Sequence, residues 1–286
     1  MQFFLDKLAA CPDDPVFAHF EVVPDHLPDA LKSGIQQFPP GSLQFEIGIQ
    51  TFNPDVQARI SRKQDNDKAA ENIRWLCEHS HAHLHVDLIA GLPGEDIASF
   101  ASGFNKLVQL EPHEIQFGIL KRLRGTPIIR HTEEYQMVFD QSPPYTILAT
   151  RELDFLTMQR LVRFARYWDL IANSGRFNHT LKLILADDPF RNFMDLSDWL
   201  YANTDATHRI AMERLAKLVA DWLHQERGIE QTEIAAQLKL DYAGQISPEK
   251  IPRSERKKLI EEQQRSGKNN IPERQIRHLE MQTTPN

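Results

Sequence analysis

The first 123 residues alternate between apolar strand patterns and amphipathic helix patterns, and this alternation limits the possible folds most strongly. Strands are predicted at 16–25, 44–50, 83–91 and 114–123, and helices at 1–10, 27–38, 67–79 and 95–110, with one more beginning at Asn53. Such alternation is typical of a parallel sheet with crossover helices. The sheet is either open and doubly wound or an arc of a barrel. Both arrangements place their chemistry at the carboxyl ends of the strands.

The pattern changes after residue 140, where helical periodicity continues without a clear strand signal. Helices are predicted at 153–177, 179–186, 191–203, 206–226 and 230–241. From residue 243 the chain is polar, with one short helix expected near 254–265. We therefore expect three parts: a parallel β/α region at 1–140, an all-helical domain at 141–242 and a polar tail, irregular or disordered, at 243–286.

Composition excludes several classes of protein. The formal net charge of −7 argues against a nucleic-acid partner, because a phosphate-binding surface needs clustered Lys and Arg. No apolar run is long enough to span a membrane, and the amino terminus does not resemble a signal peptide. The chain has only two cysteines, Cys11 and Cys77. This usage predicts a reducing cytoplasm and no disulfide framework.

Polar residues occupy alternate positions of three predicted strands. In the strand at 44–50 the apolar residues share one face, and helices on the outside of the sheet would cover that face. The opposite face would carry a polar set that points inward: His19, Glu21, Glu46, Gly48, Gln50, His85 and Asp87. Burying such groups without partners costs several kcal/mol. Internal ion pairs would explain any single residue, whereas the whole set in phase indicates a bound polar ligand.

Three other stretches offer simpler interpretations. Alternating histidines in HSHAHLH (79–85) can chelate a metal, but no neighbouring cysteine completes a site, and we expect no metal there. GLPGED (91–96) lacks the lysine of a P-loop and is predicted to be a tight turn. The aromatic stripe of the helix at 153–177 is predicted to be core: Phe155, Phe164, Tyr167, Trp168 and Phe177.

The phrases GIQTFNPDVQARISRKQ and VDLIAGLPGED resemble the radical S-adenosylmethionine (SAM) superfamily. The branch they resemble most contains oxygen-independent coproporphyrinogen oxidase and the radical SAM proteins with a cobalamin-binding domain. ILKRLRGTPI and LTMQRLVRFARYWDLIANSGRF resemble the carboxyl-terminal region of one subgroup, which has an appended helical domain of unknown function. The resemblance implies a partial (β/α)6, TIM-type barrel that holds SAM across its strand ends, followed by helices.

The resemblance also implies roles for six residues. Gln50 and Asp87 would contact the SAM ribose, and Arg62 its carboxylate. Glu21 would lie near the SAM amino group. The adenine would be contacted by Ile89 and Leu120. Carboxylates that accept from hydroxyl and ammonium groups, and a guanidinium that clamps a carboxylate, suit these roles chemically.

One departure from the superfamily is severe, because the C-x-x-x-C-x-x-C motif that binds the [4Fe–4S] cluster is absent. We therefore expect this chain to be the carboxyl-terminal part of a radical SAM enzyme, inactive alone, with the cluster in a missing upstream part. That missing half is then a candidate partner, and cobalamin a candidate cofactor of the full-length family. The substrate is a small molecule that cannot be read from the sequence. The alternatives are a degenerate, non-catalytic β/α binding module and an unrelated β/α enzyme.

Overall fold

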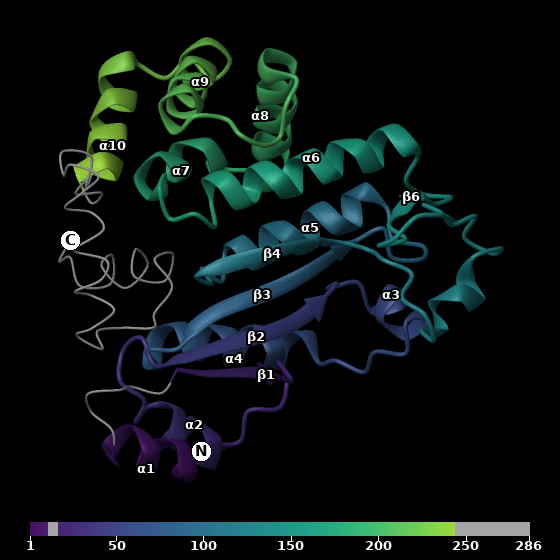
Figure 1. Cartoon of the computed structure of the whole chain (residues 1–286), viewed down its shortest axis with the longest axis vertical. Helices are drawn as coiled ribbons and strands as arrows, with labels where there is room; N and C mark the ends of the chain where they lie inside the picture. The colour runs from purple at the N-terminus through teal and green to yellow at the C-terminus, as the bar shows by residue number, and fades with distance from the viewer. Residues whose placement is uncertain (11–16, 244–286) are drawn as a thin grey trace, which may run out of the picture.

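A computed structural model describes residues 1–10 and 17–243 and contains one four-stranded parallel sheet (Figure 1). Its strands are β1 (Ala18–Val22), β2 (Leu43–Gln50), β3 (His83–Ala90) and β4 (Glu114–Ile119). They lie side by side in chain order. A doubly wound sheet reverses its strand order at a switch point. The unbroken order therefore favours the predicted partial TIM-type barrel.

One helix of this part precedes β1, and the others connect the strands. They are α1 (Gln2–Ala10), α2 (Asp29–Ile35), α3 (Pro54–Arg59), α4 (Asn66–His79) and α5 (Ile97–Val108). The predicted start at Asn53 is confirmed, because the Asn53 side chain accepts hydrogen bonds from the amides of Asp55 and Val56, and Pro54 occupies the first turn. Figure 1 shows α4 behind the strands, where it covers the far face of the sheet.

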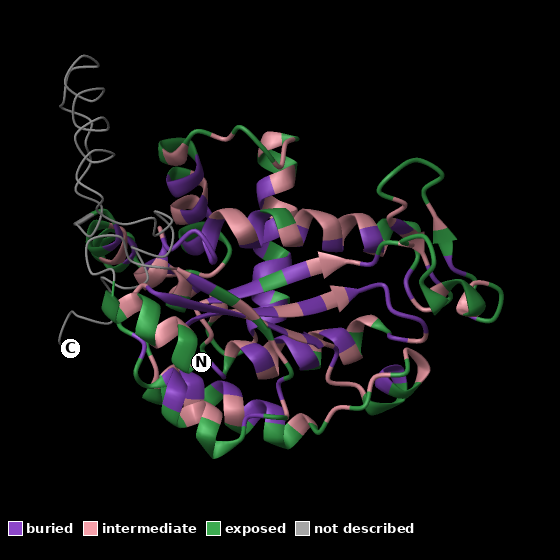
Figure 2. Cartoon of the chain, turned by 60° about the horizontal axis from the view of Figure 1, so that its bottom comes forward, coloured by how far each residue is buried: buried purple, intermediate pink, exposed green. Residues whose placement is uncertain are grey.

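Alternate residues of each strand differ in exposure (Figure 2). In β2 and β3 the apolar set is almost completely buried, whereas most of the intervening residues are only half-buried: Glu46, Gly48, Gln50, His85, Asp87 and Ile89. The predicted separation into an apolar face under helices and a polar face is therefore confirmed. We call the side of the sheet that carries these intervening residues the polar face.

The helical region follows as α6 (Phe155–Ile171), α7 (Asn178–Leu185), α8 (Pro189–Thr204), α9 (Met212–Gln225) and α10 (Gln231–Ala243). A short 3-10 helix, η1 (Pro127–His131), and a small antiparallel pair, β5 (Val138–Phe139) and β6 (Ile147–Ala149), precede it. The pair was not predicted, because strands of two and three residues are too short to show a period. β4 ends at Ile119, earlier than predicted, and the next residue, Leu120, donates its N–H to the Ala90 carbonyl and accepts from the Ile147 amide.

Aromatic side chains join the helical region to the sheet. Phe164 of α6 lies 4.9 Å from Phe117 of β4 and 5.2 Å from Phe104 of α5, ring centre to ring centre. Of the predicted aromatic stripe, four residues are buried, but Phe155 is 50% exposed because it opens the first turn of α6. Asn173 adds a polar link, since its side-chain amide donates to the carbonyl of Ile115 and accepts from its N–H.

The helical region and the sheet share one hydrophobic cluster, and the domain boundaries stay a prediction. The polar tail and its expected helix lie outside the described residues. Among the helices of the described chain, none has the length and apolar character needed to cross a bilayer.

Candidate functional site

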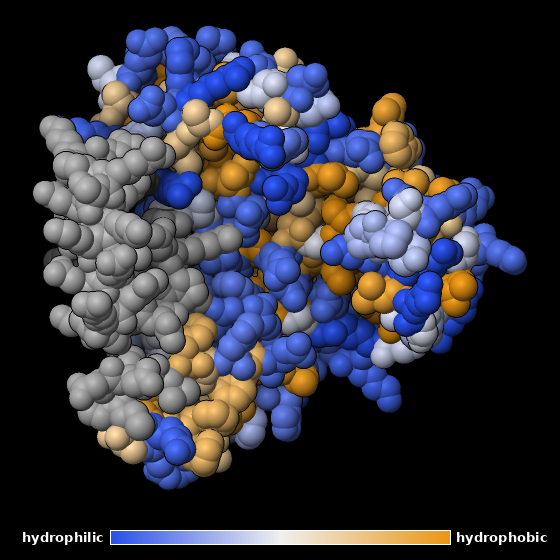
Figure 3. All heavy atoms as spheres, viewed as in Figure 1, coloured by the Kyte–Doolittle hydropathy of each residue, from blue (hydrophilic) through white to orange (hydrophobic). Residues whose placement is uncertain are grey.

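The polar face carries the side chains that could form a binding or catalytic site. Figure 3, which shares the view of Figure 1, shows hydrophilic residues gathered across the middle of this side. The polar residues form two groups along the strands. One group lies toward the carboxyl ends and contains the residues predicted to bind SAM. The other lies toward the amino ends and contains histidines and glutamates.

Gln50 is the last residue of β2, and its backbone departs from the strand. Its φ is +67°, in the left-handed region, and the register between β2 and β3 shifts between Gly48 and Gln50. A Cβ on Gly48 would meet the Gln50 Nε2 at 2.5 Å, so the Gln50 side chain turns back over Gly48. The missing side chain of Gly48 therefore makes room for the Gln50 amide on the polar face.

Arg62 reaches the same place from the turn after α3. Its guanidinium donates to the Gly48 carbonyl through Nη2 and to Gln64 Oε1 through Nε, the latter at 2.9 Å. Burial lowers the pKa of Arg62, and the carboxylate of Asp25 partly offsets that effect. The guanidinium thus has a fixed position beside Gln50, with a cationic charge that a ligand carboxylate would complement.

Asp87 lies in register with Gly48 on the neighbouring strand. The pKa of Asp87 is raised to about 6, mainly by burial and in part by the Glu46 and Glu21 carboxylates, while His85 opposes the rise. These interactions place Glu21, Glu46 and Asp87 on one side of the sheet. The structure therefore brings Gln50, Arg62 and Asp87 together, with the exposed Glu21 of β1 nearby.

Two acceptor atoms of this group are buried and lack a hydrogen-bond partner within the described part of the chain. They are Oε1 of Gln50 and Oδ1 of Asp87. A buried acceptor without a partner costs about 1–3 kcal/mol. Each atom therefore has the chemistry to receive a donor, such as a hydroxyl group, from a ligand.

The two residues predicted to contact adenine lie beyond Asp87. Ile89 is half-buried, and its Cγ1 lies 3.5 Å from the position that a Cβ on Gly118 would take. Leu120 is buried directly after β4, with its N–H bonded to the Ala90 carbonyl. Both lie at the carboxyl edge of the sheet. Their roles, like those of the other four predicted residues, stay predictions.

Sequence reasoning missed a buried acid at the same edge. Glu95, in the turn GLPGED, is only 2% exposed and accepts hydrogen bonds from the hydroxyls of Thr51 and Ser99. Burial raises the pKa of Glu95 to about 7, against the effect of those two hydrogen bonds. Glu95 thereby ties the turn after β3 to the turn after β2. A single acid within a predicted turn gave no sign of this role.

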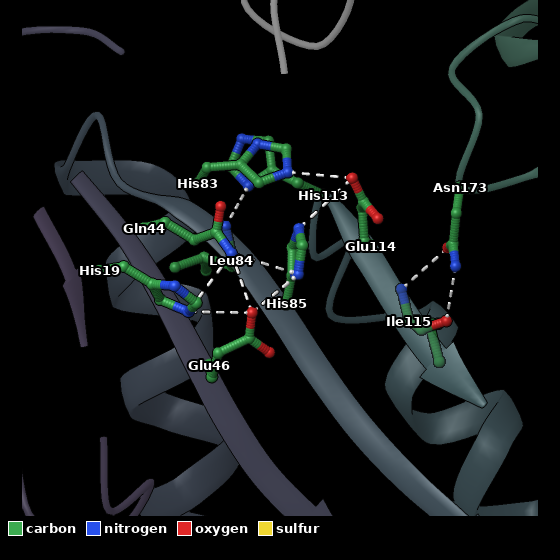
Figure 4. A network of polar contacts seen from close by, with 10 residues as sticks. All are labelled: His19, Gln44, Glu46, His83, Leu84, His85, His113, Glu114, Ile115 and Asn173. Atoms are coloured by element: carbon green, nitrogen blue, oxygen red, sulfur yellow. Dashed lines mark hydrogen bonds and ion pairs between the residues drawn. The ribbon is translucent and has the colours of Figure 1, made fainter. Parts of the chain in front are cut away.

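The second group of polar residues forms a network at the amino ends of the strands (Figure 4). Glu46 Oε1 lies 3.1 Å from His19 Nε2 and 3.0 Å from His85 Nδ1. Glu114 Oε1 lies 3.3 Å from Nε2 of both His83 and His85. Of the two predicted inward histidines, His19 contacts Glu46 alone, whereas His85 also contacts Glu114, a carboxylate of β4 that the sequence did not connect with it.

Comparison with known families identifies the family of the carboxyl-terminal part. The family described as "Protein of unknown function (DUF4080)" matches residues 133–285, which is more than half of the chain. The chain belongs to this family. Its match begins near the end of η1 and includes every helix from α6 to α10.

Curated relatives connect the DUF4080 chain to the radical SAM superfamily. It is 33% identical over 75 residues to the oxygen-independent coproporphyrinogen III oxidase of Synechocystis, which covers 26% of this chain and 16% of that protein. It is 25% identical over 151 residues to the uncharacterized protein YtqA of Bacillus subtilis, which covers 52% of this chain and 47% of YtqA. The chain thus spans less than half of either relative. It is a radical SAM superfamily relative of coproporphyrinogen oxidase, as its motifs predicted.

Solved structures of that superfamily are also similar, though distantly. Coproporphyrinogen III oxidase (HemN) from Escherichia coli, a radical SAM enzyme, is 22% identical with a TM-score of 0.36, over 50% of this chain and 31% of that one. The radical SAM methyltransferase TsrM from Kitasatospora setae is 14% identical with a TM-score of 0.41, over 55% of this chain and 31% of that one.

Proposed function

We propose that the carboxyl-terminal half of the polar face binds SAM, and that this DUF4080 chain is the SAM-binding part of a radical SAM enzyme. Gln50 and Asp87 would accept from the ribose hydroxyls, and the Arg62 guanidinium would pair with the methionine carboxylate. Glu21 would face the amino group, while Ile89 and Leu120 would pack on the adenine. In the superfamily, SAM supplies the radical that abstracts a hydrogen atom from the substrate.

The observation that carries this proposal is the pair of buried acceptors on neighbouring strands. Gln50 Oε1 and Asp87 Oδ1 have no partner within the described residues, and a ribose offers two adjacent hydroxyl donors. The positive charge of Arg62 stands on the same side, held by the Gly48 carbonyl. A nucleoside that also carries a carboxylate fits this combination of groups.

The residues of this chain do not fit the [4Fe–4S] cluster. A cluster of this type needs four ligands, usually thiolates, and the chain has two cysteines. Of these, only Cys77 lies in the described part, where burial raises the pKa of its thiol to about 12 and its Sγ donates to the carbonyls of Leu110 and Glu111. We propose that the cluster belongs to an upstream part or a partner chain, and that this chain alone performs no radical chemistry. Use of cobalamin by the full-length family is a further proposal from the resemblance.

Titration of SAM into the purified chain, followed by ligand-observed NMR, tests the SAM site. Without cluster iron to hold its amino and carboxylate groups, we expect SAM to bind no more tightly than roughly millimolar, worth about 4 kcal/mol. Asp87→Ala and Gln50→Ala should each weaken binding about tenfold, because each removes a hydrogen bond of 1 kcal/mol or more.

Asp96→Asn is the matched control, since this exposed residue follows the same strand but points its carboxylate at the Ser99 amide. It should bind SAM like the unaltered chain. Equal SAM binding in all four proteins, or none in the unaltered chain, would reject the site and favour a degenerate, non-catalytic module. Anaerobic reconstitution with about four irons per chain would reject the placement of the cluster elsewhere.

A further inference from the structure

The histidine and glutamate network at the amino ends of the strands has the composition of a metal site. His83 and His85 stand on one face of β3, and Glu114 begins the neighbouring β4. One ligand atom from each of the three residues lies within 4.8 Å of the others. Two imidazoles and one carboxylate form the ligand set that many catalytic zinc sites and non-haem iron sites use.

The spacing of the ligand atoms suits a small divalent ion. Zinc binds nitrogen and oxygen ligands at about 2.0–2.2 Å, so two ligands of a tetrahedral site stand roughly 3.3–3.6 Å apart. Glu114 Oε1 lies 3.3 Å from His83 Nε2 and 3.3 Å from His85 Nε2. Two of the three ligand separations therefore already have the length that a tetrahedral ion requires.

A second carboxylate orients one of the proposed ligands. Glu46 Oε1 lies 3.0 Å from His85 Nδ1, on the opposite side of the ring from Glu114. A hydrogen bond from Nδ1–H to Glu46 would leave the lone pair of Nε2 directed at the ion, as in the carboxylate–histidine–metal arrangement of many metalloproteins. Gln44 Nε2 donates to the same Glu46 oxygen at 2.8 Å, and His19 contacts it from β1. Contacts with Gln44 of β2 and His19 of β1 thus fix the position of the Glu46 carboxylate.

The three proposed ligands are largely shielded from solvent. The side chains of Glu114 and His83 are only 6% and 7% exposed, whereas that of His85 is 20% exposed. His113 is directed elsewhere, because its Nδ1 accepts from the Leu84 amide at 3.1 Å.

We propose that His83, His85 and Glu114 bind one divalent transition-metal ion, zinc in the first place, with Glu46 as the positioning residue behind His85. Three protein ligands leave a fourth coordination position for water or a substrate oxygen. The site lies on the same face as the proposed SAM site but nearer the amino ends of the strands, and it does not depend on SAM or on an iron–sulfur cluster.

Metal uptake by the full chain tests this proposal directly. The protein is stripped with a chelator, dialysed against zinc, and assayed for bound zinc, while cobalt(II) is titrated in parallel for its visible ligand-field spectrum. We expect one zinc per chain, a cobalt spectrum of the intense tetrahedral type, and a higher midpoint of thermal unfolding with zinc. His83→Gln and Glu114→Gln should each abolish the cobalt spectrum and the stoichiometric zinc.

Two further variants make the result specific. His81→Gln alters an exposed histidine of the same HSHAHLH run and should bind zinc like the unaltered chain. Glu46→Gln should keep the stoichiometry but weaken affinity about 10–100-fold, as is usual when a ligand loses its orienting partner. No zinc in the unaltered chain would overturn the proposal, and so would unchanged binding in both His83→Gln and Glu114→Gln. If a variant fails to fold, the zinc bound by the unaltered chain still tests the proposal.

Discussion

The two faces of the four-stranded sheet are made by alternate residues of the same strands, and they differ in what satisfies their side chains. On the apolar face the side chains of β2 and β3 are buried at 0–2% exposure, and aromatic contacts extend that packing through α5 to α6 and α8. On the polar face the carboxyl-terminal half contains buried acceptors without partners among the described residues. The apolar face is satisfied by packing within the described chain, whereas the polar face retains acceptor atoms that packing within these residues leaves unpaired.

This difference indicates how one strand can serve stability and binding at once. Because side chains alternate across a strand, a substitution on one face leaves the packing of the other largely intact. Stability should therefore depend mainly on the apolar face, and ligand binding on the polar face. Each of the following substitutions tests one side of that division.

The largest effect is expected from Phe164→Ala in α6. Phe164 is fully buried against Phe104, Phe117 and Phe193, so its removal should lower the free energy of unfolding by about 3–5 kcal/mol. Phe155→Ala, in the same helix but 50% exposed, should change it by about 0.5 kcal/mol or less. Urea unfolding of both variants measures the contrast. Equal losses in both variants would show that the aromatic cluster does not stabilise the junction.

A smaller effect on the free energy of unfolding is expected from the ionisation of Glu95. Its side chain is as buried as those of the apolar face. Its pKa of about 7 in the folded chain, against 4.5 as the ordinary value, means that the folded chain holds this proton between those pH values while the unfolded chain has lost it. Stability should therefore fall as pH rises across this window, by about 3 kcal/mol in total.

Glu95→Gln isolates that contribution, because the amide stays neutral at every pH. The variant and the unaltered chain should have similar unfolding free energies at pH 4. The variant should become the more stable of the two as the pH approaches 8. Urea unfolding at a series of pH values gives the difference, and a difference that is constant from pH 4 to pH 8 would refute the cost assigned to the buried acid.

The smallest effect is expected at Gln50, where the backbone itself is strained. A left-handed φ costs a residue other than glycine about 1 kcal/mol, so Gln50→Gly should stabilise the fold by about that amount while it removes a proposed SAM contact. Gln50→Ala loses the same side chain but keeps the strain. A Gly variant no more stable than the Ala variant, by thermal unfolding, would show that the strain is absent.

Much of the architecture could be predicted from the sequence, because period and capping are local signals. The four parallel strands, the start of α3 at Asn53 and the division of the sheet into two faces all follow from residue order. The order of the strands in space does not, since open and barrel-like sheets share the same alternation. The pair β5 and β6 was missed because its strands are too short to carry a period.

The candidate sites show the same limit. Gln50, Arg62 and Asp87 could be predicted as candidates because each lies in a recognisable phrase of a strand or of the turn that follows. The contact of Glu114 with His83 and His85 was missed because it depends on the register of β3 with β4, which the sequence does not reveal. Glu95 was missed because its burial results from the turn after β2 packing on the turn after β3.

The most direct measurement is the map of backbone amide shifts that SAM causes in the NMR spectrum of the labelled chain. We expect the shifted signals to cluster at residues 48–50, 62 and 87–91, at the carboxyl ends of β2 and β3, and to spare α6 to α10. Asp87→Ala should require about tenfold more SAM to cause the same shifts. Shifts confined to the helical region, or none at a SAM concentration well above millimolar, would contradict a SAM site on the polar face.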